Sequence, residues 1–133
     1  MDSAWEGAVT RGDVEAVRRL IRSGANVNVR NRHGQTALMV AAHRGDRAMV
    51  EELVASGADL DVTAKYKLSA LMLAIVAGHA AVARVLARAG ANLELRGTGA
   101  PGFTGKTAYD LAVARSMEEV YADLDPGDPE RQR

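Results

Sequence analysis

The sequence predicts an all-α solenoid of four helix-turn-helix repeats that are joined by short β-turn fingers. Two series of glycines recur at an interval of 33 residues: Gly12, Gly45 and Gly78, and Gly24, Gly57 and Gly90. A period of this length is typical of stacked repeats, in which each unit buries its apolar face only against its neighbours. Hydrophobic residues make up 47% of the chain but aromatic residues only 4%, which indicates a core of alanine and small aliphatic side chains.

The apolar positions keep the same register as the glycines. Thr36, Ala37, Leu38 and Ala41 lie 33 residues before Ser69, Ala70, Leu71 and Ala74, and the same interval relates Val17 to Val50 and Ala83, and Leu20 to Leu53 and Leu86. We therefore expect one domain over residues 1–124, with repeats at about 1–27, 28–60, 61–93 and 94–124.

Each repeat is expected to contain two short helices. The first spans about 37–44 in the second repeat and begins at Thr36, whose hydroxyl can accept a helix N–H; Ser69 and Thr107 recur in that column. A glycine separates it from a second helix, whose apolar face contains Val50 and Leu53. Gly57 should end that helix in the left-handed conformation.

The first and last units depart from this pattern. Trp5 occupies the column of Leu38 and Leu71, and the first unit has no incoming finger, so we expect an N-terminal cap. In the fourth unit residues 105–112 match 34–41 at a shift of 71, which places a five-residue insertion in the third finger. Residues 125–133 are polar and proline-rich, which predicts a disordered tail.

Residues 34–46 read Gly-Gln-Thr-Ala-Leu-Met-Val-Ala-Ala-His-Arg-Gly-Asp, and the repeat closes with Gly-Ala-Asp at 57–59. At these residues the chain resembles the ankyrin repeat family, and the resemblance covers nearly the whole chain. It departs from the family pattern at Ala37 and Met39, where proline and histidine are usual. Lys67 stands where Gly34 and Gly105 do, which predicts an irregular second finger because such a turn favours glycine.

The resemblance implies that partner-facing side chains lie on the finger tips and on the exposed side of the first helix of each repeat. The residues at those positions are Arg11, Arg32, His33, Gln35, His43, Arg44, Lys65, Tyr66, Leu68, Val76, Phe103, Lys106 and Arg115. None of them is acidic, whereas Glu15, Asp46, Glu51 and Glu52 fall on the opposite helix. We therefore expect a basic concave face that binds an acidic partner protein, although solvated surface charge would produce the same pattern.

Two of the few aromatic residues fall in the fingers, where Tyr66 and Phe103 would suit an interface centre. Leu68 and Val76 would extend that apolar patch. The alternative for Phe103 is that it folds back to cover the last repeat.

No residue pattern supports an enzyme or a cofactor. Residues 100–107 fit a relaxed phosphate-loop pattern through Gly105, Lys106 and Thr107, but the glycine and threonine already have structural positions in the repeat, so nucleotide binding is only a remote alternative. His33, His43 and His79 lack metal-ligand spacing, and His79 stands in the column of Asp13 and Asp46, where a helix-start hydrogen bond is the ordinary role.

The composition and charge of the chain narrow the possible partners and cellular locations. The formal net charge is +0, so binding of nucleic acid or another polyanion by the basic face is the second reading. The chain has no cysteine, no secretory signal pattern and no apolar stretch long enough to span a membrane. We expect a cytoplasmic monomer, and the richness in alanine and arginine favours a bacterial source with a GC-rich genome.

Overall fold

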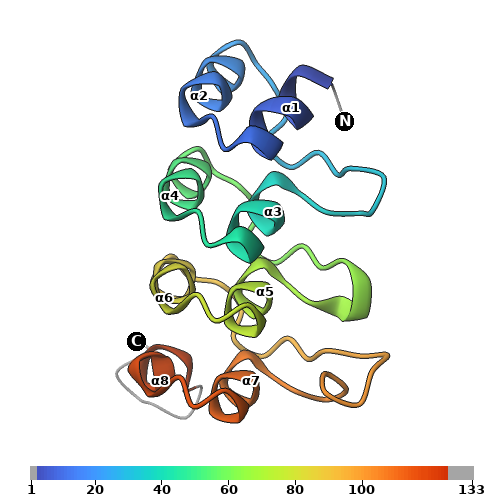
Figure 1. The fold of residues 1–133 in the computed structure, drawn as a ribbon, viewed down its shortest axis with the longest axis vertical. Helices are drawn as coiled ribbons and strands as arrows, with labels where there is room; N and C mark the ends of the chain where they lie inside the picture. Colours follow the sequence, from blue (N-terminus) through green and yellow to red (C-terminus); the bar gives the residue numbers. More distant parts are fainter. Residues whose placement is uncertain (1–2, 126–133) are drawn as a thin grey trace.

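Residues 3–125 of the computed structural model form four helix pairs stacked into one elongated array (Figure 1). The inner helices are α1 (Ser3–Arg11), α3 (Ala37–Arg44), α5 (Ala70–Val76) and α7 (Ala108–Ala114). The outer helices are α2 (Val14–Arg22), α4 (Arg47–Ala55), α6 (Ala80–Arg88) and α8 (Tyr121–Leu124). Two 3₁₀ turns, η1 (Lys65–Lys67) and η2 (Glu118–Val120), complete the described elements, which include no strand. The predicted all-α repeat solenoid is confirmed.

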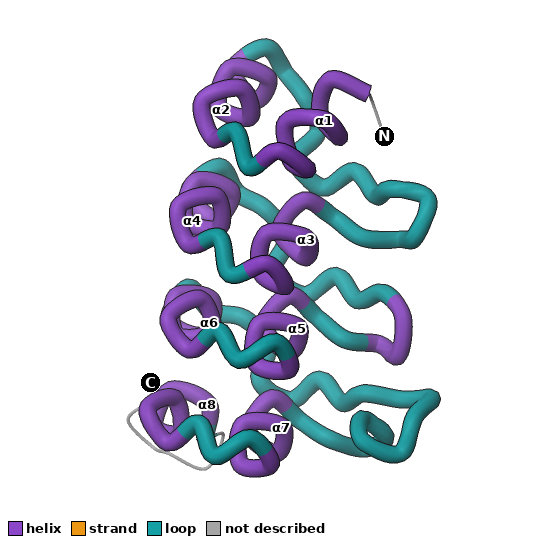
Figure 2. Tube along the Cα trace, in the orientation of Figure 1, coloured by secondary structure: helices purple, strands orange, loops and turns teal. Residues whose placement is uncertain are grey.

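Three long loops project to the same side of the array, beyond the inner helices (Figure 2). We name them finger one (28–36), finger two (61–69) and finger three (94–107). Finger three carries the insertion predicted from the sequence and forms an additional small loop at its tip (Figure 2). Of the tail predicted to be disordered, only Asp125 lies within the described residues.

Side-chain caps start most of the helices. The hydroxyls of Thr36, Ser69 and Thr107 accept backbone N–H groups of α3, α5 and α7 at 3.2–3.3 Å, as the sequence predicts. The carboxylates of Asp13 and Asp46 do the same for α2 and α4 at 3.0 and 3.2 Å. The repeating Thr/Ser and Asp columns therefore fix where each helix of a pair begins.

His79 does not fill the role that its column predicts. It precedes α6 but makes no side-chain cap to that helix; instead its Nε2 lies 3.1 Å from the carbonyl oxygen of His43, in the preceding repeat. The expectation of a helix-start hydrogen bond is therefore wrong. The imidazole reaches across the repeat boundary and bonds to the preceding repeat in place of its own helix.

The core runs continuously along the stack. One column consists of four fully buried alanines: Ala8, Ala41, Ala74 and Ala112. Their small side chains let neighbouring inner helices approach closely, while Leu38, Leu71 and Trp5 fill the space beside them at 1–2% exposure. Burying a leucine of this kind contributes about 1.5–3 kcal/mol.

Polar contacts between successive loops fix the spacing of the repeats. The side-chain oxygen of Asn28 accepts the backbone N–H of Asp59 at 2.7 Å, and one period later Asp61 accepts the N–H of Asn92 at 2.8 Å. These two contacts form an Asx ladder, in which each repeat satisfies a backbone donor of the next.

Candidate functional site

Finger one is a tight turn that its own residues stabilise. Asn31 accepts the backbone N–H groups of His33 and Gln35 through its side chain at 2.9 and 3.0 Å. Gly34 occupies the left-handed region at φ 77°, where a residue without Cβ is least strained. Arg30 then donates to the carbonyl oxygen of Thr63 at 3.1 Å and joins finger one to finger two.

Finger two has a strained tip. Tyr66 and Lys67 both adopt positive φ, 62° and 56°, in the 3₁₀ turn η1. Left-handed backbone costs roughly 1–2 kcal/mol for each residue that carries a Cβ. The irregularity predicted from Lys67 is therefore present, and it extends to Tyr66 as well.

The inserted part of finger three packs against that strained tip. The backbone N–H of Thr98 donates to the carbonyl oxygen of Tyr66 at 2.8 Å, and the rings of Tyr66 and Phe103 lie 5.4 Å apart in a tilted arrangement. Gly99 approaches so closely that a Cβ there would lie 2.9 Å from Cδ1 of Tyr66. The insertion thus stabilises the conformation that finger two cannot adopt cheaply alone.

The insertion is itself a closed loop. Gly97 and Thr104 form a bridge, Gly97 donates to the carbonyl oxygen of Lys106 at 3.0 Å, and Gly105 donates back to Gly97 at 2.9 Å. A Cβ on Gly97 would lie 2.6 Å from the carbonyl oxygen of Phe103. The loop can close only because this position lacks a side chain.

We call Lys65, Tyr66, Lys67 and Phe103 the finger platform. The two lysines are exposed and the two aromatic rings are half-buried. The Lys65 ammonium lies 5.0 Å from the centre of the Tyr66 ring, which favours a cation–π contact. The platform therefore presents positive charge beside a partly accessible apolar surface.

Arg44, predicted to face a partner, has a structural role. Its guanidinium donates to the carbonyl oxygens of Val9 at 2.9 Å and Thr10 at 3.1 Å, at the end of α1, and lies 3.4 Å from a carboxylate oxygen of Asp46. A cation at these carbonyl groups stabilises the end of the helix and ties the second repeat to the first.

Leu68 does not belong to an exposed patch, and the prediction that it does is wrong. Only 4% of Leu68 is exposed, because it stands at the base of finger two and packs into the core. Gln35, in the same column of finger one, is also partly buried. This column faces inward in both fingers, which the polar residue Gln35 in finger one does not indicate.

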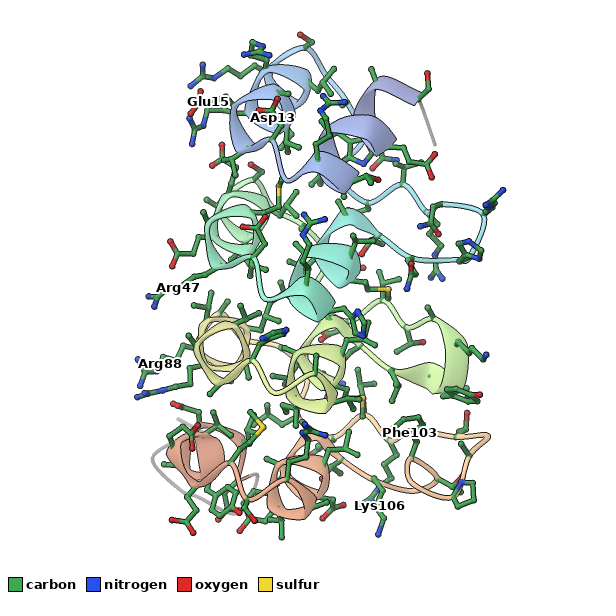
Figure 3. All side chains as sticks on the ribbon, in the orientation of Figure 1. Asp13, Glu15, Arg47, Arg88, Phe103 and Lys106 are labelled. Atoms are coloured by element: carbon green, nitrogen blue, oxygen red, sulfur yellow. The ribbon has the colours of Figure 1, made fainter. Side chains whose placement is uncertain are left out.

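The other predicted contact residues remain at least partly exposed on the fingers or at the inner helices: Arg11, Arg32, His33, Gln35, His43, Val76, Lys106 and Arg115. Figure 3 shows Lys106 pointing away from finger two, on the opposite side of the loop from Phe103. Lys106 is therefore separate from the finger platform.

The outer helices carry arginines as well as the carboxylates expected there from the sequence. Six arginines lie on α2, α4 and α6, against three glutamates on the same helices: Arg18, Arg19, Arg22, Arg47, Arg84 and Arg88, with Glu15, Glu51 and Glu52. Arg18 bonds to Glu52 at 2.6 Å and also to Glu15. The hydrogen bond to Glu52, followed by the one to Glu15, raises the pKa of Arg18 above its ordinary value.

The segment that fits a relaxed phosphate-loop pattern is occupied by helix capping. Gly105 provides a positive φ of 75°, and the Thr107 hydroxyl accepts the N–H of Asp110 at 3.2 Å. The Asp110 carboxylate accepts the backbone N–H of Thr107 in return, at 3.0 Å, and this bond holds the pKa of Asp110 below its usual value. The reciprocal cap uses the hydroxyl that a phosphate site would need.

Within residues 3–125, no group of three or more histidine, aspartate or glutamate side chains is arranged to hold a metal ion. None of the described helices has the length and apolar character needed to cross a membrane.

Two features of the surface were not predicted from the sequence. One is the docking of finger three on Tyr66; its signal was the concentration of glycines in the insertion, at Gly97, Gly99 and Gly102. The other is the Asx ladder, which the spacing of Asn28 and Asp61 could have indicated.

In a comparison with known protein families, a model described as ankyrin repeats, in three copies, matches residues 6–97. A comparison with curated proteins gives no match. The matched range runs from within α1, through the second and third helix pairs, to the start of the inserted loop. The chain belongs to the ankyrin repeat family.

Proposed function

We propose that this chain is a non-catalytic adaptor or inhibitor that binds an acidic surface of a partner protein through the finger platform and the exposed cations around it. Ankyrin repeats generally mediate protein–protein interactions, and the family is typically non-catalytic. In this proposal any catalysis belongs to the partner. The chain acts as a cytoplasmic monomer. Its lack of cysteine suits a reducing compartment, and the exposed Glu118 and Glu119 give the last repeat the polar surface of a terminal cap.

The observation that carries the proposal is the strained pair Tyr66 and Lys67 at the tip of finger two. Strained backbone persists where the surroundings over-determine it, and such positions cluster at functional sites. Here a whole inserted loop holds the strain, and the result is an aromatic pair flanked by exposed lysines. Aromatic residues near the centre of an interface commonly dominate its binding energy.

The charge of the fingers supports an acidic partner. The cations exposed on the fingers include Arg32 on finger one and Lys65 and Lys67 on finger two. Positive groups on neighbouring projections attract a negatively charged surface during encounter and help to select it against neutral surfaces.

The test compares two variants with the same change in charge. Lys65→Glu/Lys67→Glu alters the platform, and Arg19→Glu/Arg22→Glu alters exposed arginines on the outer helix α2. Arg44 is left unchanged because it ties α3 to α1. Proteins captured from a lysate of the source cell by the wild-type chain are identified by mass spectrometry, and the affinity of each purified candidate is then measured with all three chains.

We expect the platform variant to weaken partner binding by about tenfold or more, and the α2 variant to change it by less than about twofold. Equal losses in the two variants would show a general charge effect instead of a site. A partner held equally well by both variants would move the interface away from finger two.

The polyanion reading predicts a different result. Binding of nucleic acid by the fingers would weaken steeply as salt is raised, because counterions are released on binding. Fluorescence anisotropy with single-stranded and duplex oligonucleotides, in low salt and then in physiological salt, separates this outcome from recognition of a protein.

A further inference from the structure

The outer helices carry an arrangement of arginines that the finger platform does not explain. Two of the three seams between outer helices are joined by opposite charges. Arg18 on α2 bonds to Glu52 on α4 at 2.6 Å, and Arg84 and Arg88 on α6 both bond to Asp123 on α8 at 3.2 Å. The seam between α4 and α6 is different.

Arginines from both helices line a single pocket at the α4–α6 seam. The pocket has a volume of about 280 Å³ and is lined by Arg47, Ala81, Arg84, Val85 and Arg88, so no carboxylate lies among the described residues of its wall. Figure 3 shows Arg47 and Arg88 extending from the same edge of the stack, one from α4 and the other from α6. Positive groups that face one another repel unless an anion lies between them.

Within the described part of the chain, neighbouring carboxylates bond to these arginines through Nε. Glu51 bonds to Nε of Arg47 at 2.6 Å, and the two oxygens of Asp123 each bond to one Nε, of Arg84 and of Arg88. Asp123 is only 18% exposed and orients two guanidinium groups together. Among residues 3–125, the bonds of Arg47, Arg84 and Arg88 to carboxylates all involve Nε, so their terminal N–H groups can act as donors toward the pocket that these side chains line.

We infer that the α4–α6 seam is a binding site for a phosphate group, carried by a phosphorylated side chain or by a small molecule. A phosphate monoester has three peripheral oxygens and a charge near −2 at neutral pH, which suits donors from three guanidinium groups better than the two oxygens of a carboxylate do. Ala81 and Val85 provide an apolar wall for the carbon atoms next to the ester oxygen. This site is independent of the finger platform and lies on the opposite side of the stack.

The test uses NMR of the arginine Nε–H groups of the wild-type chain at constant ionic strength. The probes are inorganic phosphate, a short glycine peptide with one central phosphoserine, and the same peptide with serine in its place. We expect both phosphates to shift the signals of Arg84 and Arg88 saturably and the serine peptide to leave them unchanged. Arg19 and Arg22, exposed arginines on α2, provide the internal control.

Tighter binding of the phosphopeptide than of inorganic phosphate would point to a phosphorylated protein, and the reverse to a small molecule. Acetate at the same ionic strength tests the choice of phosphate over carboxylate. Equal shifts at Arg19 and Arg22, or equal effects of acetate and phosphate, would overturn the proposal.

A variant series then tests the assignment. Arg84→Gln/Arg88→Gln should weaken phosphate binding by about tenfold or more, because two forked donors are lost. Arg84→Lys/Arg88→Lys keeps the charge but not the fork, and should produce an intermediate loss. Unchanged affinity in a folded glutamine variant would contradict the site. If that variant fails to fold, the wild-type NMR data and the lysine variant still decide the question, and Lys65→Glu/Lys67→Glu should bind phosphate like the wild type.

Discussion

Finger one and finger two occupy the same columns of the repeat but reach their conformations by different means. In finger one, Gly34 takes the left-handed position and the Asn31 side chain braces the turn with two hydrogen bonds. In finger two the same columns hold Lys67 and Ala64, so the turn has neither a glycine nor a polar brace. Finger one is therefore stabilised mainly by its own residues, whereas finger two depends on contacts with finger three.

The insertion in finger three supplies the contacts on which finger two depends. Thr98 and Phe103 reach finger two from the extra residues of finger three, through a hydrogen bond of 2.8 Å and a ring contact of 5.4 Å. A finger that is held from outside can present side chains in a conformation that its own sequence disfavours.

The largest expected loss of stability comes from a change at Gly97 that disturbs the docking of finger three on finger two. Gly97→Ala places a Cβ 2.6 Å from the Phe103 carbonyl oxygen, so we expect a loss of about 1–3 kcal/mol in the free energy of unfolding. Gly102→Ala is the matched control, because a Cβ there meets nothing within 4 Å. Urea unfolding measures both variants, and NMR of the Thr98 amide reports whether the loop still docks. Similar losses in the two variants would show that the close approach at Gly97 is unimportant.

The next effect comes from exchanging the tip residues of the two fingers. Gly34→Lys should lower the free energy of unfolding by about 1–2 kcal/mol, because a side chain is forced into positive φ. Lys67→Gly should raise it by about 0.5–1 kcal/mol, since the relief of strain is partly offset by the entropy of glycine in the unfolded chain.

Thermal and urea unfolding of both single variants and of the double variant check this prediction. Any departure of the double variant from the sum of the two changes measures the coupling that Arg30 provides between the two fingers. Destabilisation by Lys67→Gly would mean that the lysine side chain itself supports finger two.

The smallest effect concerns the helices that follow the fingers. At the start of α7, which follows finger three, the Asp110 carboxylate accepts the backbone N–H of the cap residue Thr107. At the start of α5, which follows finger two, the corresponding acceptor is the Met72 sulfur, 3.5 Å from the Ser69 N–H. Thioether sulfur is a weak acceptor. Asp110→Asn should therefore cost about 0.5–1 kcal/mol at neutral pH, while Met72→Leu should leave the cap of α5 unaffected.

The pH dependence of that loss has a definite sign. Because the folded-state pKa of Asp110 is lowered, its contribution is present above the pKa of the unfolded chain and disappears as pH falls through the lower, folded value. Urea unfolding between about pH 5 and pH 2 should show a steeper fall for the wild type than for Asp110→Asn. Parallel curves for the two chains would contradict the assignment.

Much of the fold could be predicted from the sequence because it depends on local residue types in fixed columns. Thr36 as a helix cap and Gly57 as a left-handed helix end are both confirmed. The irregularity of finger two also follows from one residue, since Lys67 stands in a glycine column.

The rest depends on contacts between distant residues. The burial of Leu68 and the reach of His79 to the preceding repeat follow from how neighbouring repeats pack, which a column comparison does not describe. Likewise the sequence indicated an insertion but not that its backbone would touch the Tyr66 ring, because that contact needs the positions of two fingers in space. The partner-contact residues remain predictions, apart from Leu68, which is buried.

The Asx ladder has a consequence for how this array could grow. Asn28 and Asp61 each supply a side-chain acceptor. The residues whose backbone N–H groups donate to them, Asp59 and Asn92, recur at the same interval. A duplicated 33-residue unit therefore brings both halves of this connector, so the ladder itself would continue through an added repeat. Only an addition between the third and fourth repeats would part finger two from the loop that supports it.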